Sequence, residues 1–129
     1  VDYLVTRPEI DTGKLAFYGM SWGGWLGTIL PAVENRISLN ILVAGGLNYT
    51  GRPEVNAINY VSRITIPTLM LNGMYDRWID QEIKPMMELL GTSPEHKKLI
   101  LYETDHIPPK AEYIRETLAW LDRYFGPVR

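Results

Sequence analysis

Apolar residues along the chain form four short runs that alternate with stretches of helical periodicity. The runs cover residues 15–18, 39–44, 66–71 and 98–102. Runs of this length with few polar positions are typical of strands buried on both faces, which occur in parallel sheets. We therefore predict an α/β fold in three layers, with a mainly parallel sheet of about four strands and right-handed crossovers.

Helical spacing of apolar residues predicts the connections between these strands. One face after the first run carries Trp22, Trp25, Leu26, Ile29, Leu30 and Val33, and Pro31 with the polar residues 34–36 should close that helix. A second helix is predicted over Gln81–Leu90, where Pro85 would kink it or delay its start. The clearest helix is Pro109–Phe125, with Pro109 at its first position and Gly126-Pro127 ending it.

Two segments outside this alternation have weaker patterns. Val1–Thr6 resembles the last turn of a helix that stops before Pro8, and it would place the start of the chain inside a helix. Asn48–Arg63 is a long connection with a short helix expected over residues 53–60. Its role stays open between a structural crossover and a wall that faces a substrate, since loops at this end of a sheet carry function.

The segment Gly19-Met20-Ser21-Trp22-Gly23 matches G-x-S-x-G where the first strand is expected to meet its helix. A serine on so sharp a turn must adopt a strained backbone, typically with positive φ. Gly19 and Gly23 would remove Cβ atoms that otherwise clash. The hydroxyl would then project at the C-terminal edge of the sheet, with the N–H of Trp22 facing a developing oxyanion. Alternatively, Ser21 merely caps the helix of an ordinary glycine-rich turn.

Composition excludes several classes of function. The chain has 129 residues, a net charge of −2 and no basic stripe, so we expect a single domain, residues 1–129, that binds neither nucleic acid nor an anionic membrane. No apolar run reaches transmembrane length, and no signal-peptide pattern is present. With no cysteine and two histidines, we expect no disulfide, no metal centre and no cofactor. This composition is compatible with the cytoplasm, where we expect the protein.

The glycine–serine segment resembles the nucleophile elbow of the α/β-hydrolases. The stretches DYLVTRPEID, GMSWGG and ETLAWLDRYFGP are similar to segments of dienelactone-hydrolase-like and prolyl-oligopeptidase-like serine hydrolases. The resemblance covers nearly all of this chain but only the C-terminal half of the family's domain. It implies a truncated α/β-hydrolase fold without the N-terminal strands, and a catalytic triad in the chain order serine, acid, histidine.

Candidates for the acid and the base each follow a predicted strand. Asp76 matches the family's G-x-x-D segment, whereas Asp80 stands where a helix N-cap is wanted and Asp105 is interpreted as a turn residue. The base candidate is His106, in the loop after the last strand, although Asp105 replaces the glycine that often precedes the family's histidine. His96 lies in a polar run and is assigned to a solvated loop.

The resemblance also implies what this chain lacks. The loop that supplies the family's second oxyanion N–H belongs to the missing half, which leaves only the N–H of Trp22 recognisable. The strand over residues 15–20, central in the family, would be an uncovered apolar edge. We therefore expect a homodimer in which two such strands pair antiparallel about a two-fold axis.

Three functions compete on these residues. The leading one is a serine hydrolase of an ester, or less favourably an amide, with Ser21 as nucleophile, His106 as base and Asp76 as its orienting acid. Tyr75, Trp78 and Trp22 would line its pocket or belong to the core. The second is an inactive assembly or binding module that inherits the triad. The third, a flavodoxin-like ligand-binding domain, is disfavoured because no G-x-G-x-x-G segment follows a strand.

Overall fold

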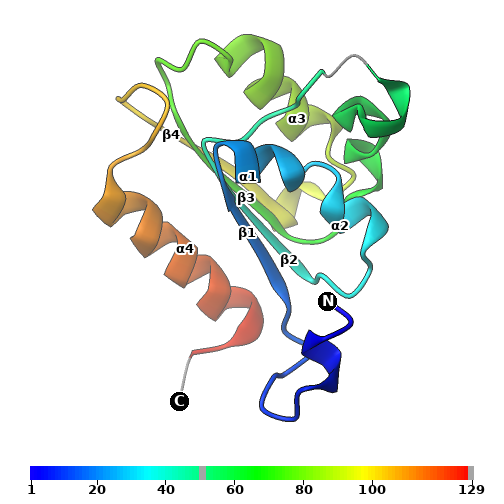
Figure 1. The fold of residues 1–129 in the computed structure, drawn as a ribbon. Helices are drawn as coiled ribbons and strands as arrows, with labels where there is room; N and C mark the ends of the chain where they lie inside the picture. Colours follow the sequence, from blue (N-terminus) through cyan, green and yellow to red (C-terminus); the bar gives the residue numbers. More distant parts are fainter. Residues whose placement is uncertain (50–51, 128–129) are drawn as a thin grey trace.

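The computed structural model describes residues 1–49 and 52–127. Its four strands form one parallel sheet in the order in which they occur along the chain (Figure 1). These strands are β1 (Ala16–Met20), β2 (Leu39–Val43), β3 (Thr68–Gly73) and β4 (Lys97–Tyr102). The predicted α/β class and parallel sheet are confirmed, and each observed strand lies within two residues of its predicted run.

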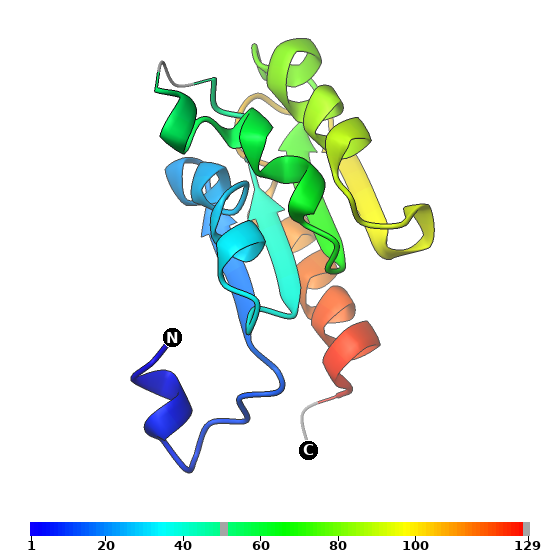
Figure 2. The ribbon, with the colours of Figure 1, turned by 90° about the vertical axis from the view of Figure 1, so that its right-hand side faces the viewer.

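Helices cover the sheet on both faces (Figures 1 and 2). Helix α4 (Lys110–Phe125) lies on one face, and the opposite face carries α1 (Trp22–Leu26), α2 (Leu30–Val33) and α3 (Lys84–Leu89). Alternate residues of each strand feed the two layers of the core, as the strand period of two requires. On β2, for example, Ile41 packs in the cluster that contains Trp120 of α4, whereas Leu42 packs with Met86 of α3.

The helix predicted after the elbow is divided into α1 and α2. Residues 27–29 between them are turn, because a helical N–H is missing at Pro31 and its ring disfavours a helix across the preceding turn. Gly27 also permits close packing there, since a Cβ on it would lie 2.2 Å from Cδ2 of Leu42. Residues 27–29 between the two helices therefore pack closely against β2.

The connections differ from the prediction in three places. The expected N-terminal helical turn is a single 3₁₀ turn, Leu4–Thr6, and the connection 48–63 contains 3₁₀ turns at Pro53–Val55, Ala57–Asn59 and Val61–Arg63. Residues 50 and 51 of that connection lie outside the described residues. The helix predicted from Gln81 is a π-helical turn, Ile79–Ile83, followed by α3 with Pro85 in its first turn. No helix in the described ranges is long and apolar enough to cross a bilayer.

Candidate active site

Ser21 occupies the sharp turn between β1 and α1. Its φ of 52° and ψ of −111° lie outside the regions that non-glycine residues ordinarily adopt. Its N–H donates to the carbonyl of Val43 at 2.8 Å, which ties the turn to the end of β2. The Ser21 hydroxyl makes no capping hydrogen bond to α1 in the described chain, so the alternative that it serves as a helix cap is wrong.

The glycines around Ser21 act differently from the steric prediction. A Cβ on Gly19 would lie 2.2 Å from the carbonyl oxygen of Gly23, as expected for the near side of the turn. The expectation for Gly23 is wrong, because a Cβ there would meet nothing within 4 Å. Instead Gly24 makes the second close approach, where a Cβ would lie 2.7 Å from Cα of Gly45. The elbow is therefore pressed between β1 and the segment that follows β2.

Asp76 stands three residues beyond β3 at the same edge of the sheet. Its side chain is only 2% exposed, and its Oδ1 accepts a hydrogen bond from the N–H of Trp78 at 3.1 Å. The other oxygen, Oδ2, lies 2.6 Å from Nδ1 of His106. Asp80 is not the predicted N-cap, because it lies inside the π-helical turn and its carboxylate pairs with Lys84 at 2.6 Å.

His106 is brought to Ser21 by the loop after β4. This loop packs so closely on Gly73 that a Cβ there would lie 1.4 Å from the carbonyl oxygen of Asp105. Nε2 of His106 lies 2.8 Å from Oγ of Ser21. A neutral imidazole with its proton on Nδ1 would donate to Asp76 and accept from Ser21, which is the assignment that this network favours. His96 is elsewhere, with Nδ1 2.9 Å from the hydroxyl of Tyr124 on α4.

Aromatic rings connect the elbow to the histidine. Ring centroids are 5.9 Å apart for Trp22 and Trp25, 6.1 Å for Trp25 and Trp78, and 5.5 Å for Trp78 and His106. Trp22 is 71% exposed and Tyr75 63% exposed, so neither belongs to the core, whereas Trp78 is partly buried. The rings thus form a wall along the mouth of the site.

Two cavities flank this wall. One, of about 320 Å³, is lined by Trp22, Trp25, Leu26, Ile29, Leu30, Asn48 and Val55. The other, of about 370 Å³, is lined by Tyr75, Asp76, Arg77, Trp78, Asp105 and His106. Arg77 was not predicted as a site residue, although its position next to Asp76 could have indicated it. Asp105, interpreted as a turn residue, also reaches the second cavity with His106.

A second carboxyl group, that of Glu82, lies near enough to Asp76 for the two charges to interact. Burial raises the pKa of Glu82, the negative charge of Asp76 raises it further, and Arg77 opposes this shift. Oε2 of Glu82 is buried and lacks a hydrogen-bond partner in the described part of the chain. Among the described residues, no group of three or more His, Asp or Glu side chains is placed to hold a metal ion.

No protein-family model and no curated protein matches this sequence. Solved structures with similar folds include an acetyl xylan esterase from Paenibacillus sp. R4, with a TM-score of 0.74, 20% identity, and coverage of 95% of this chain and 49% of the esterase. A 2,6-dihydroxy-pseudo-oxynicotine hydrolase has a TM-score of 0.78 and 18% identity, with coverage of 94% of this chain and 43% of that hydrolase. A putative dienelactone hydrolase from Klebsiella pneumoniae has a TM-score of 0.72 and 17% identity, with coverage of 92% of this chain and 56% of that hydrolase. This chain spans about half the length of these structures, and its fold is that of the part of these hydrolases that it covers, a truncated α/β-hydrolase fold.

Proposed function

We propose that this chain carries the catalytic triad of a serine hydrolase that cleaves carboxylic esters through an acyl-enzyme. The observation that carries the proposal is the continuous contact from Ser21 Oγ to His106 Nε2, 2.8 Å, and from His106 Nδ1 to Asp76 Oδ2, 2.6 Å. His106 takes the hydroxyl proton as Ser21 attacks the carbonyl carbon, and Asp76 stabilises the imidazolium that forms. His106 then returns the proton to the leaving oxygen.

The N–H of Trp22 is the proposed oxyanion donor. Trp22 is the first residue of α1, and the first N–H groups of a helix have no intrahelical acceptor. Removing one oxyanion donor typically costs about a hundredfold or more in rate. Esters are the proposed substrates because their alcohols leave more readily than the amines of amides. The acetyl xylan esterase among the solved structures of similar fold supports the same substrate class.

Covalent labelling with a fluorophosphonate tests this function directly. We expect intact mass spectrometry to show one adduct on the wild-type protein and none on Ser21→Ala or His106→Ala, because the probe needs an activated serine. His96→Ala is the matched control and should label like the wild type, since His96 contacts Tyr124 and not the triad. A folded wild-type protein without an adduct would favour the assembly-module alternative.

A further inference from the structure

The cavity beside His106 lies where a leaving group would depart. In the triad mechanism the histidine protonates the leaving group, so that group must be on the histidine side of the scissile carbonyl. The 370 Å³ cavity contains His106, whereas the other cavity is lined by Trp22 and Trp25 beside the elbow. If the proposed esterase function holds, the side chains around His106 therefore select the alcohol part of the ester.

One exposed aromatic ring in this cavity is available for stacking. Tyr75 is 63% exposed, and its backbone is fixed by an N–H that donates to the carbonyl of Thr104 at 3.1 Å. The neighbouring ring of Trp78 is already covered, since the guanidinium carbon of Arg77 lies 4.0 Å from its centroid. Trp78 thus holds Arg77 in place, and Tyr75 presents a flat apolar face to a ligand.

Besides Asp76, which pairs with His106, the cavity has two charged side chains, which are opposite in sign and form no ion pair within the described chain. Neither Arg77 nor Asp105 makes an ion pair with any described residue within 4.0 Å. Arg77 therefore keeps several N–H donors and Asp105 keeps carboxylate acceptors for a bound molecule. Because their charges cancel, these side chains favour a neutral ligand rich in hydroxyl groups over an ion.

We propose that this cavity binds the leaving group of an ester as a neutral polyhydroxylated ring, such as a pyranose. Tyr75 packs against the C–H face of the ring, while Arg77 donates to its hydroxyls and Asp105 accepts from them. Ser21 Oγ bonds to the acyl carbon, the bond between that carbon and the sugar oxygen breaks, and His106 delivers its proton to this oxygen. Water then attacks the acyl carbon while His106 takes its proton, the bond to Ser21 Oγ breaks, and His106 returns the proton to Oγ.

A matched pair of acetates tests the selectivity. Methyl 6-O-acetyl-β-D-glucopyranoside and cyclohexylmethyl acetate share a primary acetate on a six-membered ring and differ mainly in the sugar's hydroxyls. We expect kcat/KM to favour the sugar ester at least about tenfold, and Tyr75→Ala or Asp105→Asn to lower that ratio about tenfold. Tyr3→Ala, an exposed tyrosine on the N-terminal segment, should leave the ratio unchanged.

A binding measurement separates this inference from the proposed function. Saturation-transfer NMR of methyl β-D-glucopyranoside should give a signal with the Ser21→Ala protein and lose it when Tyr75→Ala is added. Equal kcat/KM for the two acetates, with the fluorophosphonate adduct intact, would overturn the sugar site and leave the hydrolase. Sugar binding without any adduct would keep the sugar site and remove the hydrolase. If the protein shows no sugar binding and no selectivity for the sugar ester, the inference is overturned outright.

Discussion

Ser21 keeps a backbone conformation that a free serine would rarely adopt. Residues held at such φ and ψ values cost about 1–3 kcal/mol, and they persist only where the surrounding structure fixes them. Here the Ser21 N–H is held by Val43, and Gly19 and Gly24 allow β1, α1 and the segment after β2 to approach closely. The strain therefore has a visible use, because it directs Oγ to Nε2 of His106.

Two glycines of the same motif should respond differently to alanine. Gly19→Ala places a Cβ 2.2 Å from a backbone oxygen, so we expect a loss of about 1–3 kcal/mol in the free energy of unfolding and loss of the fluorophosphonate adduct. Gly23→Ala meets open space inside α1 and should stabilise the fold by about 0.5–1 kcal/mol. Urea unfolding of both variants measures the contrast, and equal destabilisation would contradict it.

The elements that follow from sequence are those with the strongest local patterns. The stripe of α4 predicts its bounds to within one residue, and buried strands such as β2 consist almost wholly of apolar residues. The division into α1 and α2 could not be predicted from apolar spacing, because it depends on Pro31 and on packing against Leu42. The spacing of apolar residues does not predict the π-helical turn after Asp76 either.

The candidate site was predictable in its residues but not in its surroundings. Ser21, Asp76 and His106 each follow a strand, and parallel strands bring such positions to one edge of the sheet, where the structure joins them. Their catalytic roles stay a prediction. The cavity beside His106 depends on the packing of the loop after β4 against Gly73, which only the folded chain brings together. The position of Arg77 next to Asp76 is the one sequence signal for it, and the structure places it in that cavity.

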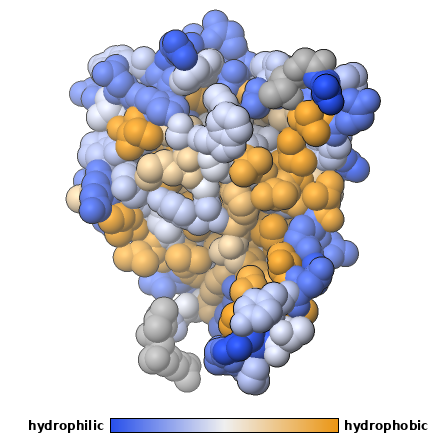
Figure 3. Space-filling view, viewed as in Figure 1, coloured by the Kyte–Doolittle hydropathy of each residue, from blue (hydrophilic) through white to orange (hydrophobic). Residues whose placement is uncertain are grey.

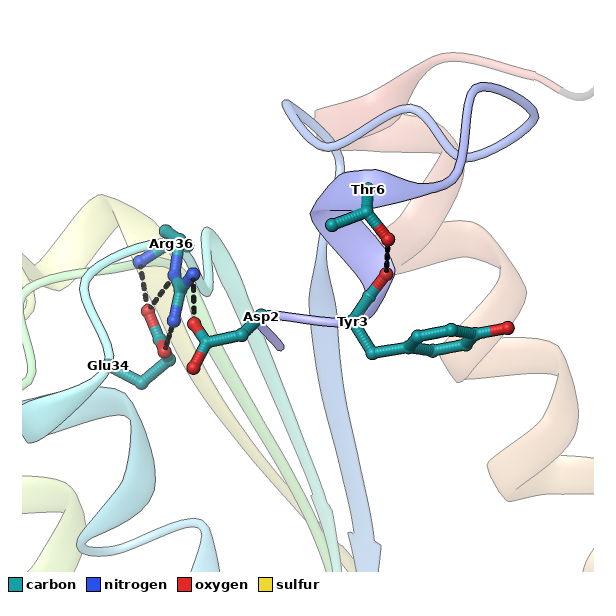
Figure 4. Close-up of polar contacts among 5 residues, drawn as sticks. All are labelled: Asp2, Tyr3, Thr6, Glu34 and Arg36. Carbon is teal, nitrogen blue, oxygen red and sulfur yellow. Dashed lines mark hydrogen bonds and ion pairs between the residues drawn. The ribbon is translucent and has the colours of Figure 1, made fainter.

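The N-terminal segment is attached to the turn before β2 by a charged cluster (Figure 4). Nη1 of Arg36 lies 2.7 Å from Oδ1 of Asp2. Arg36 also pairs with Glu34, and its Nε lies 2.7 Å from Oε1 of Glu34. Hydrogen bonds from the side chain and backbone of Arg36 lower the pKa of Glu34 to about 2. A lowered carboxyl pKa stabilises the fold fully above the unfolded value of 4.5, and this contribution disappears as pH falls to about 2.

The effect of Glu34→Gln on melting should consequently depend on pH. We expect the variant to melt below the wild type at pH 6, and the difference to shrink progressively from pH 4.5 toward pH 2. Glu88→Gln, an exposed carboxyl on α3 without an ion pair in the described ranges, is the control and should show no such trend. Thermal melts at intervals of pH measure the difference. The effect should be small and weakened by salt, since Glu34 and Arg36 are only partly buried.

At the scale of the whole molecule, β1 is one of the two edge strands of the sheet in the described residues. Within the described residues β1 pairs with β2 alone, so its outer edge presents unpaired backbone groups. Figure 3 views this side and shows apolar residues gathered over it. Large exposed apolar side chains lie on β1 and on helices of both layers: Tyr18, Leu26, Leu30, Val33, Ile114 and Leu118. An apolar surface around an unpaired strand is typical of an interface.

We propose that a second copy of the chain covers this side, with the two β1 strands antiparallel about a two-fold axis. Two four-stranded sheets would then join into one, and each site would gain the neighbour's backbone as a source of a second oxyanion donor. Light scattering at micromolar concentration should give twice the 14.8 kDa mass of one chain. Tyr18→Lys should yield monomers by placing a charge on the edge, whereas Leu89→Lys, on α3, should not. A monomeric wild-type protein would exclude this assembly.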